Sequence, residues 1–209
     1  MMTEPAIDVR MRGDRISAGG APRARGEVAA RRADREAGTA LRWGRFDAEG
    51  FGPLWLGWTD RGLARLDFDR PGEGAAGDVA GAPVPERFAA PLWRYFAGAR
   101  EDFKAVPLDL RGTAFQRAVW AALREVPYGA VCSYATIAAR IGNPRAMRAV
   151  GAANGKNPVA IIVPCHRIVE AGGGLGGYTG GLERKRFLLA REGTRVIDGR
   201  VQPGQLDLF

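Results

Sequence analysis

From Ser133 to Ala153 the chain reads Ser-Tyr-Ala-Thr-Ile-Ala-Ala-Arg-Ile-Gly-Asn-Pro-Arg-Ala-Met-Arg-Ala-Val-Gly-Ala-Ala. Ser133 is a favoured residue just before a helix, and Gly142 is typical of a helix end. Pro144 then suits the first position of a second helix. A helix, a tight turn and another helix in this order predict a helix-turn-helix, a motif that many DNA-binding proteins place against a groove.

The second predicted helix combines basic and small side chains. Arg145 and Arg148 are three residues apart and would share a face of that helix. Ala149 and Gly151 are small, so the backbone beside them can approach a nucleic acid closely. The alternative is an alanine-rich helix that only packs within its own protein, and the local charge favours DNA.

Basic residues are concentrated in one part of the chain. The 209 residues carry a net charge of +8, and residues 111–192 hold 12 basic and 4 acidic side chains, which is the same excess. Residues 41–110 hold 9 basic and 11 acidic side chains. A basic region beside a slightly acidic one indicates a polyanionic partner on one side only. The alternative is a solvated basic surface without a partner.

Composition excludes several classes of protein. No run of about 18 apolar residues occurs, so we expect no membrane span, and residues 1–40 lack the apolar stretch of a secretory signal. Two cysteines, Cys132 and Cys165, are too few for a disulfide scaffold and indicate a reducing compartment, here the cytoplasm and its nucleoid. With His166 as the one histidine, four Cys/His ligands for zinc are not available, and no metal is expected.

Composition and hydrophobic spacing divide the chain into four segments: a disordered Ala/Arg/Gly-rich tail (1–40), a small α/β domain (41–109), a mostly α DNA-binding domain with the helix-turn-helix (110–193) and a C-terminal tail (194–209). In the α/β domain, the patterns predict strands at 51–58 and 62–68 and a helix at 85–97. Thr113 and Gln116 form a capping box that opens the first helix of the second domain.

A reactive side chain follows an apolar run. Val159-Ala-Ile-Ile-Val163 is dominated by β-branched residues and predicts a buried strand, and Pro164-Cys165-His166 comes directly after it. A thiol attacks carbon as the thiolate, so it needs a nearby base or positive charge. Adjacent residues on an extended backbone point to opposite sides, so we expect the imidazole to reach the thiol through a water molecule. The alternative is an inert buried cysteine beside a histidine, as Cys132 is interpreted to be an ordinary buried cysteine.

Two further features accompany this thiol. The imidazole needs a carboxylate to orient it, and Glu192 is one candidate, which spacing alone does not select. The glycine-rich run 172–181 lacks the Gly-Lys-Ser/Thr ending of a phosphate-binding loop, so nucleoside triphosphate binding is not expected. Such a loop either closes over a flat base, with Tyr178 as a wall, or is a flexible connector.

These pieces together resemble the O6-alkylguanine-DNA alkyltransferases, also called methylated-DNA–protein-cysteine methyltransferases. The likeness runs from about Gly112 to Gly193, and residues 41–108 look like the variable N-terminal domain of that family. Its motifs are Ile162–Val169, Val131–Tyr134, Arg148–Gly151, Asn154–Pro158 and Gly177–Gly181.

The resemblance implies a role in the reaction for each matching residue. Cys165 aligns with the nucleophile that accepts the alkyl group, His166 with the base that takes its proton through a water, and Glu192 with the carboxylate that orients the imidazole. Asn157 aligns with the asparagine that braces the turn between the DNA-reading helix and the active-site strand. Tyr134 aligns with the tyrosine that protonates N3 of the departing guanine and crowds the phosphate during flipping. The thioether product is not reversed, which implies one turnover and no cofactor.

The same match implies how DNA is held. Arg148 aligns with the side chain that fills the gap left by the flipped nucleotide, on a helix that lies in the minor groove. The DNA-facing surface also includes Arg145, Ala149 and Gly151. The base pocket consists of Tyr178, Thr179 and Ile168, with the N–H of Thr179 toward O6. The implied partner is double-stranded DNA that contains O6-alkylguanine, bound by a monomer.

The chain ends in Gln205-Leu206-Asp-Leu208-Phe209 after a Pro-Gly pair. This ending resembles the peptide by which bacterial DNA-processing proteins bind the sliding clamp, with Leu206, Leu208 and Phe209 in an apolar pocket and Gln205 fixing the register. The alternative is a tail that docks on its own domain.

Two other functions compete with the single-turnover transferase. One is a protein that binds the lesion without transferring the alkyl group. The other is a cysteine hydrolase that uses Cys165, His166 and Glu192, for which a burst followed by steady turnover is expected.

Overall fold

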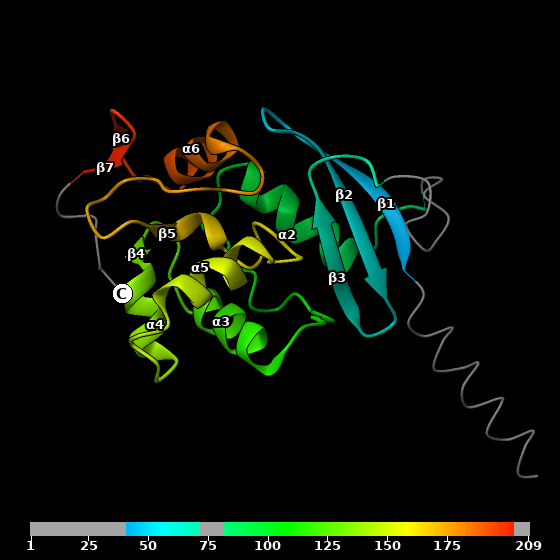
Figure 1. Ribbon diagram of the computed structural model, residues 1–209. Helices are drawn as coiled ribbons and strands as arrows, with labels where there is room; N and C mark the ends of the chain where they lie inside the picture. Colours follow the sequence, from blue (N-terminus) through cyan, green and yellow to red (C-terminus); the bar gives the residue numbers. More distant parts are fainter. Residues whose placement is uncertain (1–40, 72–81, 203–209) are drawn as a thin grey trace, which may run out of the picture. The chain divides into compact units, whose positions relative to one another are not determined.

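The computed structural model describes residues 41–71 and 82–202, which Figure 1 shows as coloured ribbon. Two predicted segments lie outside the described residues. They are the tail at 1–40 and the clamp-binding-like peptide from Gln205 to Phe209.

A three-stranded antiparallel sheet forms the first part of the described chain. Its strands are β1 (Arg42–Ala48), β2 (Gly52–Thr59) and β3 (Gly62–Asp67), hydrogen-bonded in the order β1-β2-β3 (Figure 1). The two predicted strands correspond to β2 and β3 and are confirmed. β1 is an additional strand, in which exposed Arg45 and Asp47 alternate with buried Phe46 and Ala48, as expected when one face of a sheet is solvated.

One helix packs against this sheet. α2 (Glu86–Phe96) confirms the helix predicted at 85–97. Phe88, Leu92 and Phe96 are four residues apart, lie on one face and are buried. The ring of Phe88 lies 6.3 Å from that of Trp58, and the ring of Phe96 lies 6.4 Å from that of Phe46, so this apolar face covers the sheet.

The second part is mostly helical. α3 (Ala114–Arg124) begins with the predicted capping box of Thr113 and Gln116. α4 (Tyr134–Arg140) begins after Ser133, whose hydroxyl accepts a hydrogen bond from the backbone N–H of Thr136. α5 (Met147–Gly155) completes the helix-turn-helix, and Nε1 of Trp120 on α3 donates to the carbonyl oxygen of Ala153 on α5 at 2.9 Å. An α/β part followed by a helical part with a helix-turn-helix confirms the predicted fold class.

The start of α5 differs from the prediction. Pro144 does not begin the helix; it lies in a turn in which the N–H of Ala146 donates to the carbonyl oxygen of Asn143 at 2.9 Å. Asn and Pro favour the first two positions of such a turn, so the fixed φ of Pro144 serves the turn instead of a helix. Arg145 therefore precedes α5 and does not share a helical face with Arg148. Gly142, at φ +73°, ends α4 in the left-handed region that glycine adopts readily.

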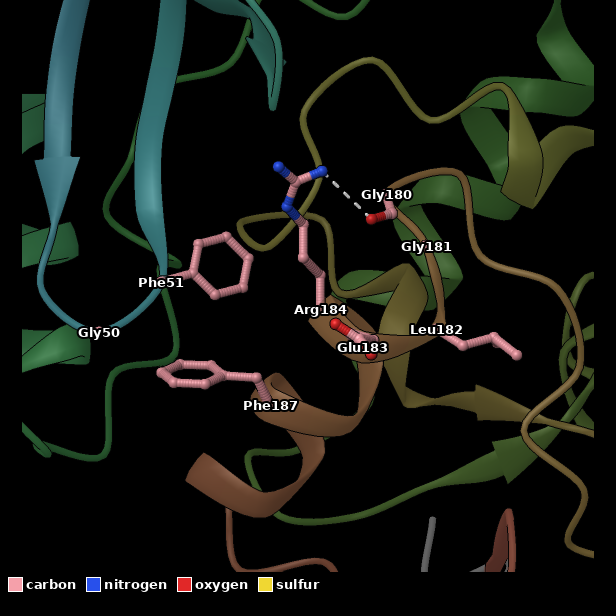
Figure 2. A pocket seen from close by; sticks show the side chains of 8 residues that line it. All are labelled: Gly50, Phe51, Gly180, Gly181, Leu182, Glu183, Arg184 and Phe187. Atoms are coloured by element: carbon pink, nitrogen blue, oxygen red, sulfur yellow. Dashed lines mark hydrogen bonds between the residues drawn. The ribbon is translucent and has the colours of Figure 1, made fainter.

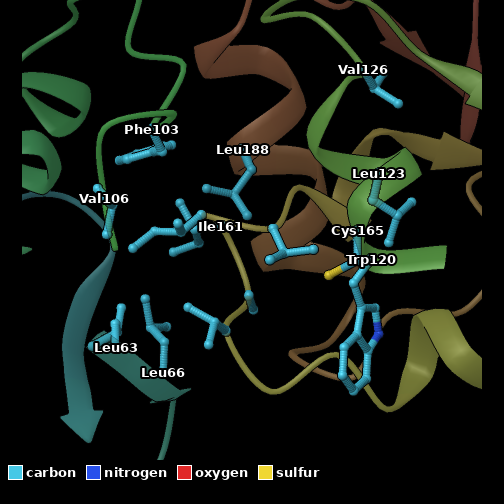
Figure 3. Packing of buried hydrophobic residues seen from close by; sticks show 14 of the residues in the cluster. Leu63, Leu66, Phe103, Val106, Trp120, Leu123, Val126, Ile161, Cys165 and Leu188 are labelled. Carbon is cyan, nitrogen blue, oxygen red and sulfur yellow. The ribbon is translucent and has the colours of Figure 1, made fainter. Parts of the chain in front are cut away.

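The run from Val159 to Val163 is buried, as predicted, but it is not a strand. Ile161 has φ +73°, and the N–H of Val163 donates to the carbonyl oxygen of Val159 at 2.9 Å, so the run folds into a tight turn. A short β-branched run indicates burial, and here local bonds satisfy the backbone in place of a ladder. Figure 3 shows Ile161 among Leu63, Leu66, Phe103, Val106 and Leu188, which places this turn in the main core.

The remaining elements are short, except for one helix. Cys165–Arg167 form a single 3-10 turn, η1, and β5 (Ile168–Val169) pairs in parallel with β4 (Cys132–Ser133). α6 (Leu182–Arg191) is followed by the hairpin of β6 (Val196–Ile197) and β7 (Arg200–Val201). Within 41–71 and 82–202, no helix has the length and apolar character needed to cross a membrane.

Candidate active site

Cys165 lines a cavity at the protein surface. Cys165 is the first residue of η1, is 5% exposed and forms no disulfide. The cavity has a volume of about 400 Å³ and is otherwise lined by Tyr134, Gly151, Asn154, Gly155, Gly177, Tyr178 and Thr179. The structure therefore brings the predicted nucleophile together with four other predicted site residues: Tyr134, Gly151, Tyr178 and Thr179.

His166 is tied to Glu192. Nε2 of His166 lies 2.9 Å from Oε1 of Glu192, and neither side chain is exposed. Nδ1 of His166 is buried without a hydrogen-bond partner in the described part of the chain, so neither ring nitrogen bonds the thiol directly. The side chains of Cys165 and His166 diverge because η1 turns by about a third of a circle per residue. The predicted reason, an extended backbone, is thus wrong, although the predicted lack of direct contact holds.

The carboxylate of Glu192 is hydrogen-bonded on both oxygens. Arg167 binds it in a bidentate manner, with Nε 2.8 Å from Oε2 and Nη2 2.9 Å from Oε1. The hydroxyl of Tyr95 donates to Oε1 at 2.9 Å, and the backbone N–H of Gly129 donates to Oε2 at 3.2 Å. Because a buried charge is tolerated only when it is paired and hydrogen-bonded, this shell is what keeps a carboxylate inside the protein.

The surroundings set the protonation of these groups. Burial lowers the pKa of His166, and Glu192 only partly opposes this effect. Burial alone would raise the pKa of Glu192, but His166 and Arg167 outweigh it and hold this pKa well below its usual range. Burial raises the pKa of Cys165, against the effects of Asn157 and Lys185. At neutral pH the site therefore holds a protonated thiol, a neutral imidazole and an ionised carboxylate, which is a nucleophile with a base at hand.

Two polar side chains hold the backbone on either side of the thiol. Nδ2 of Asn157 donates to the carbonyl oxygen of Val163 at 2.7 Å, while its Oδ1 accepts from the N–H of Val159 at 3.1 Å, which braces the tight turn before Cys165. Nζ of Lys185 donates to the carbonyl oxygen of Ile168 at 2.6 Å and also to that of Leu175. Burial lowers the pKa of Lys185 to about 8.

The predicted DNA-facing residues lie beside the cavity. A second surface pocket is lined by Tyr134, Met147, Arg148 and Gly151, together with residues 133, 135, 170 and 171. Arg145 and Ala149 are exposed but line no described cavity. Ile168, predicted in the base pocket, is fully buried in β5 and lines none of the described cavities either. Thr179 is exposed, and its hydroxyl donates to the carbonyl oxygen of Gly155 at 3.1 Å.

A larger pocket elsewhere carries no reactive group. Figure 2 shows it between Phe51 and Phe187 on one side and Arg184 on the other, with Nη1 of Arg184 donating to the carbonyl oxygen of Gly180 at 3.3 Å. Its lining holds neither a thiol nor an imidazole. Nucleophilic chemistry therefore belongs to the cavities that Cys165 lines, the second of which has a volume of about 270 Å³ and also contains Asn157.

The groups at the site that the sequence does not predict include Arg167, Tyr95 and Lys185. Arg167 adjoins His166 in the sequence, and a cation beside a predicted carboxylate–histidine pair is a signal that was available. Tyr95 lies on α2, 97 residues from Glu192, and no local pattern indicates that contact. Lys185 reads as a surface residue of a charged helix, because lysine is rarely buried.

Two family models match this chain. Residues 43–110 match the model described as 6-O-methylguanine DNA methyltransferase, ribonuclease-like domain. Residues 114–194 match the model described as 6-O-methylguanine DNA methyltransferase, DNA binding domain. The second match contains Cys165, His166 and Glu192.

Individual proteins are similar over the same region. A methylated-DNA–protein-cysteine methyltransferase of Mycolicibacterium paratuberculosis is 53% identical over 118 residues, which cover 56% of this chain and 67% of that protein. One of Methanosarcina barkeri is 44% identical over 144 residues, which cover 68% of this chain and 90% of that protein. Several other relatives are matched over 65 to 66% of their length. The crystal structure of Mycobacterium tuberculosis OGT in complex with DNA has a TM-score of 0.64 and 44% identity, over 72% of this chain and 92% of that one.

Proposed function

Since this chain belongs to the 6-O-methylguanine DNA methyltransferase family, we propose that it repairs DNA by moving an alkyl group, typically methyl, from O6 of guanine to Cys165. The protein is then a methylated-DNA–protein-cysteine methyltransferase, and each molecule performs the transfer once. The observation that carries this proposal is that Cys165 lines a cavity and is followed by a histidine that a buried carboxylate orients.

The reaction is a single displacement at carbon. Sγ of Cys165 attacks the alkyl carbon as its proton passes through a water to His166, and Glu192 stabilises the imidazolium that forms. The bond from carbon to O6 breaks, and its electron pair goes to the guanine, whose N3 takes a proton from Tyr134. Tyr134 then recovers a proton from water, and the imidazolium of His166 releases its proton to water. The products are guanine and an S-alkyl cysteine. No neighbouring group reverses a thioether, so turnover stops at one equivalent.

The substrate base must leave the duplex to reach Cys165, because O6 of a paired guanine is buried in the stack. Flipping costs a few kcal/mol and less at a damaged pair. α5 enters the minor groove, Arg148 fills the vacated space, and Ala149 and Gly151 let the backbone approach. The exposure of Arg148 beside the cavity supports this role. Arg145, in the turn before α5, contacts phosphate and contributes affinity without sequence information.

The flipped base is held between Tyr178 and Thr179, with the N–H of Thr179 toward O6. Both residues line the cavity of Cys165, which supports this assignment. Ile168 supports the pocket from the core side, since it lies in β5 just after η1. One chain supplies the nucleophile, the base, the carboxylate and the pocket, which supports action as a monomer. The proposed location is the cytoplasm, where the nucleoid lies, because free cysteines suit a reducing compartment.

The test of this function is mass spectrometry of the intact protein and its peptides after incubation with DNA carrying O6-methylguanine. One added methyl group on the peptide of Cys165, absent in Cys165→Ser and present in Cys132→Ser, is the expected result. Tight binding of the lesion without added mass would instead identify a non-transferring binder. Product that exceeds one equivalent would identify a hydrolase.

The C-terminal peptide from Gln205 to Phe209 has a separate role in the proposal. In this proposal it binds the bacterial DNA sliding clamp. The support is its sequence, with Leu206, Leu208 and Phe209 after a Pro-Gly pair at the end of the chain. A pull-down with purified clamp compares the full chain with one lacking these five residues. Equal retention of both forms would show that the peptide does not bind the clamp.

A further inference from the structure

The carboxylate of Glu192 connects two distant parts of the chain. Its Oε1 accepts a hydrogen bond from Oη of Tyr95 at 2.9 Å and lies 2.9 Å from Nε2 of His166. Tyr95 lies on α2, beside the sheet, whereas His166 follows the active-site turn. A hydroxyl from the first part of the chain therefore touches the same oxygen atom as the imidazole.

The geometry around Tyr95 fixes this hydroxyl as a donor. Its side chain is fully buried, and burial together with Glu192 raises the pKa of Tyr95 well above its usual value, so the proton stays on the tyrosine. Nε of Arg191 donates to the carbonyl oxygen of Tyr95 at 3.1 Å. The hydroxyl of Tyr128 in turn donates to the carbonyl oxygen of Arg191 at 2.8 Å. α2 is thereby held against the end of α6, from which Glu192 projects.

We infer that Tyr95 is a positioning residue, which acts through Glu192 to hold the carboxylate against His166 and to limit how firmly the imidazole binds a proton. A hydrogen bond that stabilises a carboxylate takes up part of its negative charge, so less of this charge acts on the imidazole. The charged groups that face His166 are Glu192 and Lys185 on the α6 side and Arg167 in η1. The effect of Tyr95 on alkyl transfer rests on the function proposed above, whereas its effect on His166 does not.

The variant Tyr95→Phe removes the hydroxyl and keeps the ring. The matched control is Tyr128→Phe, because the ring of Tyr128 lies 6.1 Å from that of Tyr95 while its hydroxyl binds a backbone carbonyl and not Glu192. His166 is the one histidine of the chain, so NMR of a ¹⁵N-labelled imidazole reports this site without ambiguity. We expect the titration of His166 to move to higher pH in Tyr95→Phe and to stay at its wild-type position in Tyr128→Phe.

A second variant keeps the experiment decisive if Tyr95→Phe does not fold. A 3-fluorotyrosine placed at position 95 retains the ring and the hydroxyl but makes the hydroxyl a stronger donor, so the titration of His166 should move to lower pH. An unchanged titration in both variants would overturn the inference. An equal movement in Tyr128→Phe would also overturn it, because it would reflect packing and not the bond to Glu192.

The rate of methyl transfer gives the functional readout. In Tyr95→Phe it should fall up to about 10-fold at pH 6 and stay within about twofold of wild type at pH 8.5, because only the protonated imidazole is inactive as a base. Affinity for the lesion should not change, since Tyr95 is fully buried and lines neither of the cavities beside α5. If the wild-type protein transferred no methyl group, the proposed function would fail, while the NMR titration would still decide the role of Tyr95.

Discussion

Nε2 of His166 lies 2.9 Å from Oε1 of Glu192, a residue 26 positions further along the chain, and both side chains are completely shielded from solvent. One ring nitrogen is thereby committed to the carboxylate, which leaves Nδ1 as the nitrogen that can serve the thiol. The pair also controls when the base is available, because a buried imidazole is kept neutral unless its partner outweighs the cost of burial.

The pH dependence of transfer follows from this balance. Burial lowers the pKa of His166 despite Glu192, so the imidazole stays neutral, and able to accept a proton, below the ordinary titration range of histidine. Single-turnover rates should be level from pH 7 to 8 and should decline only below about pH 6.5. A decline that already begins above pH 7 would contradict this assignment.

Removing the side chain of Arg167 should lower the free energy of unfolding. Arg167→Met leaves the buried charge of Glu192 without its bidentate partner, which costs about 3 to 5 kcal/mol of the free energy of unfolding. Urea denaturation measures this loss. Arg61→Met is the matched control, because its ion pair with Asp109 is largely exposed on the arginine side and contributes about 0 to 1 kcal/mol.

Acid should unfold the protein through the same carboxylate. Because the pKa of Glu192 is depressed in the folded state, its contribution to stability is complete above the pKa of an unfolded glutamate and is lost as the pH falls toward the folded pKa. Stability measured by thermal unfolding should therefore decline below about pH 4.3. A profile in which stability is constant down to pH 2 would show that Glu192 is not ionised in the native protein.

Asn157 should matter for transfer as well as for stability. Asn157→Ala removes both bonds that brace the turn before Cys165, which costs about 1 to 3 kcal/mol. A displaced nucleophile should slow single-turnover transfer by about 10- to 100-fold. Thr113→Ala is the control: it loses an exposed helix cap worth about 1 kcal/mol and should leave the transfer rate unchanged. Similar rates of transfer in Asn157→Ala and Thr113→Ala would show that Asn157 does not position the nucleophile.

Arg148 should be needed for duplex substrates in particular. Arg148→Ala should slow transfer from double-stranded DNA by about 10- to 100-fold, because filling the vacated stack offsets part of the few kcal/mol that flipping costs. Transfer from single-stranded DNA should change little. Arg145→Ala should instead weaken binding to all sequences alike and reduce the salt dependence by about one phosphate contact. Equal losses on duplex and single strands for Arg148→Ala would exclude a role in flipping.

Local sequence signals predict much of this molecule, and tertiary contacts account for what they miss. The capping box at Thr113, the helix that follows Ser133 and the helix around Phe88 and Leu92 depend on nearby residues and are found where the patterns place them. The turn at Pro144 and the turn at Ile161 are not, because proline fits both a turn and a helix start, and a β-branched run reports burial and not pairing.

At the active site, too, local sequence signals predict some residues and tertiary contacts account for the others. A motif and a family resemblance predict the cysteine, the histidine and the glutamate, and the structure brings the side chains of His166 and Glu192 into contact. The sequence does not predict Tyr95 and Lys185, because their contacts depend on how segments far apart in the sequence pack together. No periodicity along α2 distinguishes a tyrosine that donates to a carboxylate from one that only fills the core.

The ribosome adds residues in sequence order, so the contact between His166 and Glu192 can form only after Glu192 has been synthesised. Cys165 and His166 are added to the chain before Glu192, which follows 26 residues after His166 and orients its imidazole. A nascent chain that ends before Glu192 carries the thiol without its oriented base, and long-range contacts of this kind close late in folding. The thiol of Cys165 therefore gains its oriented base only after Glu192 has been added to the chain.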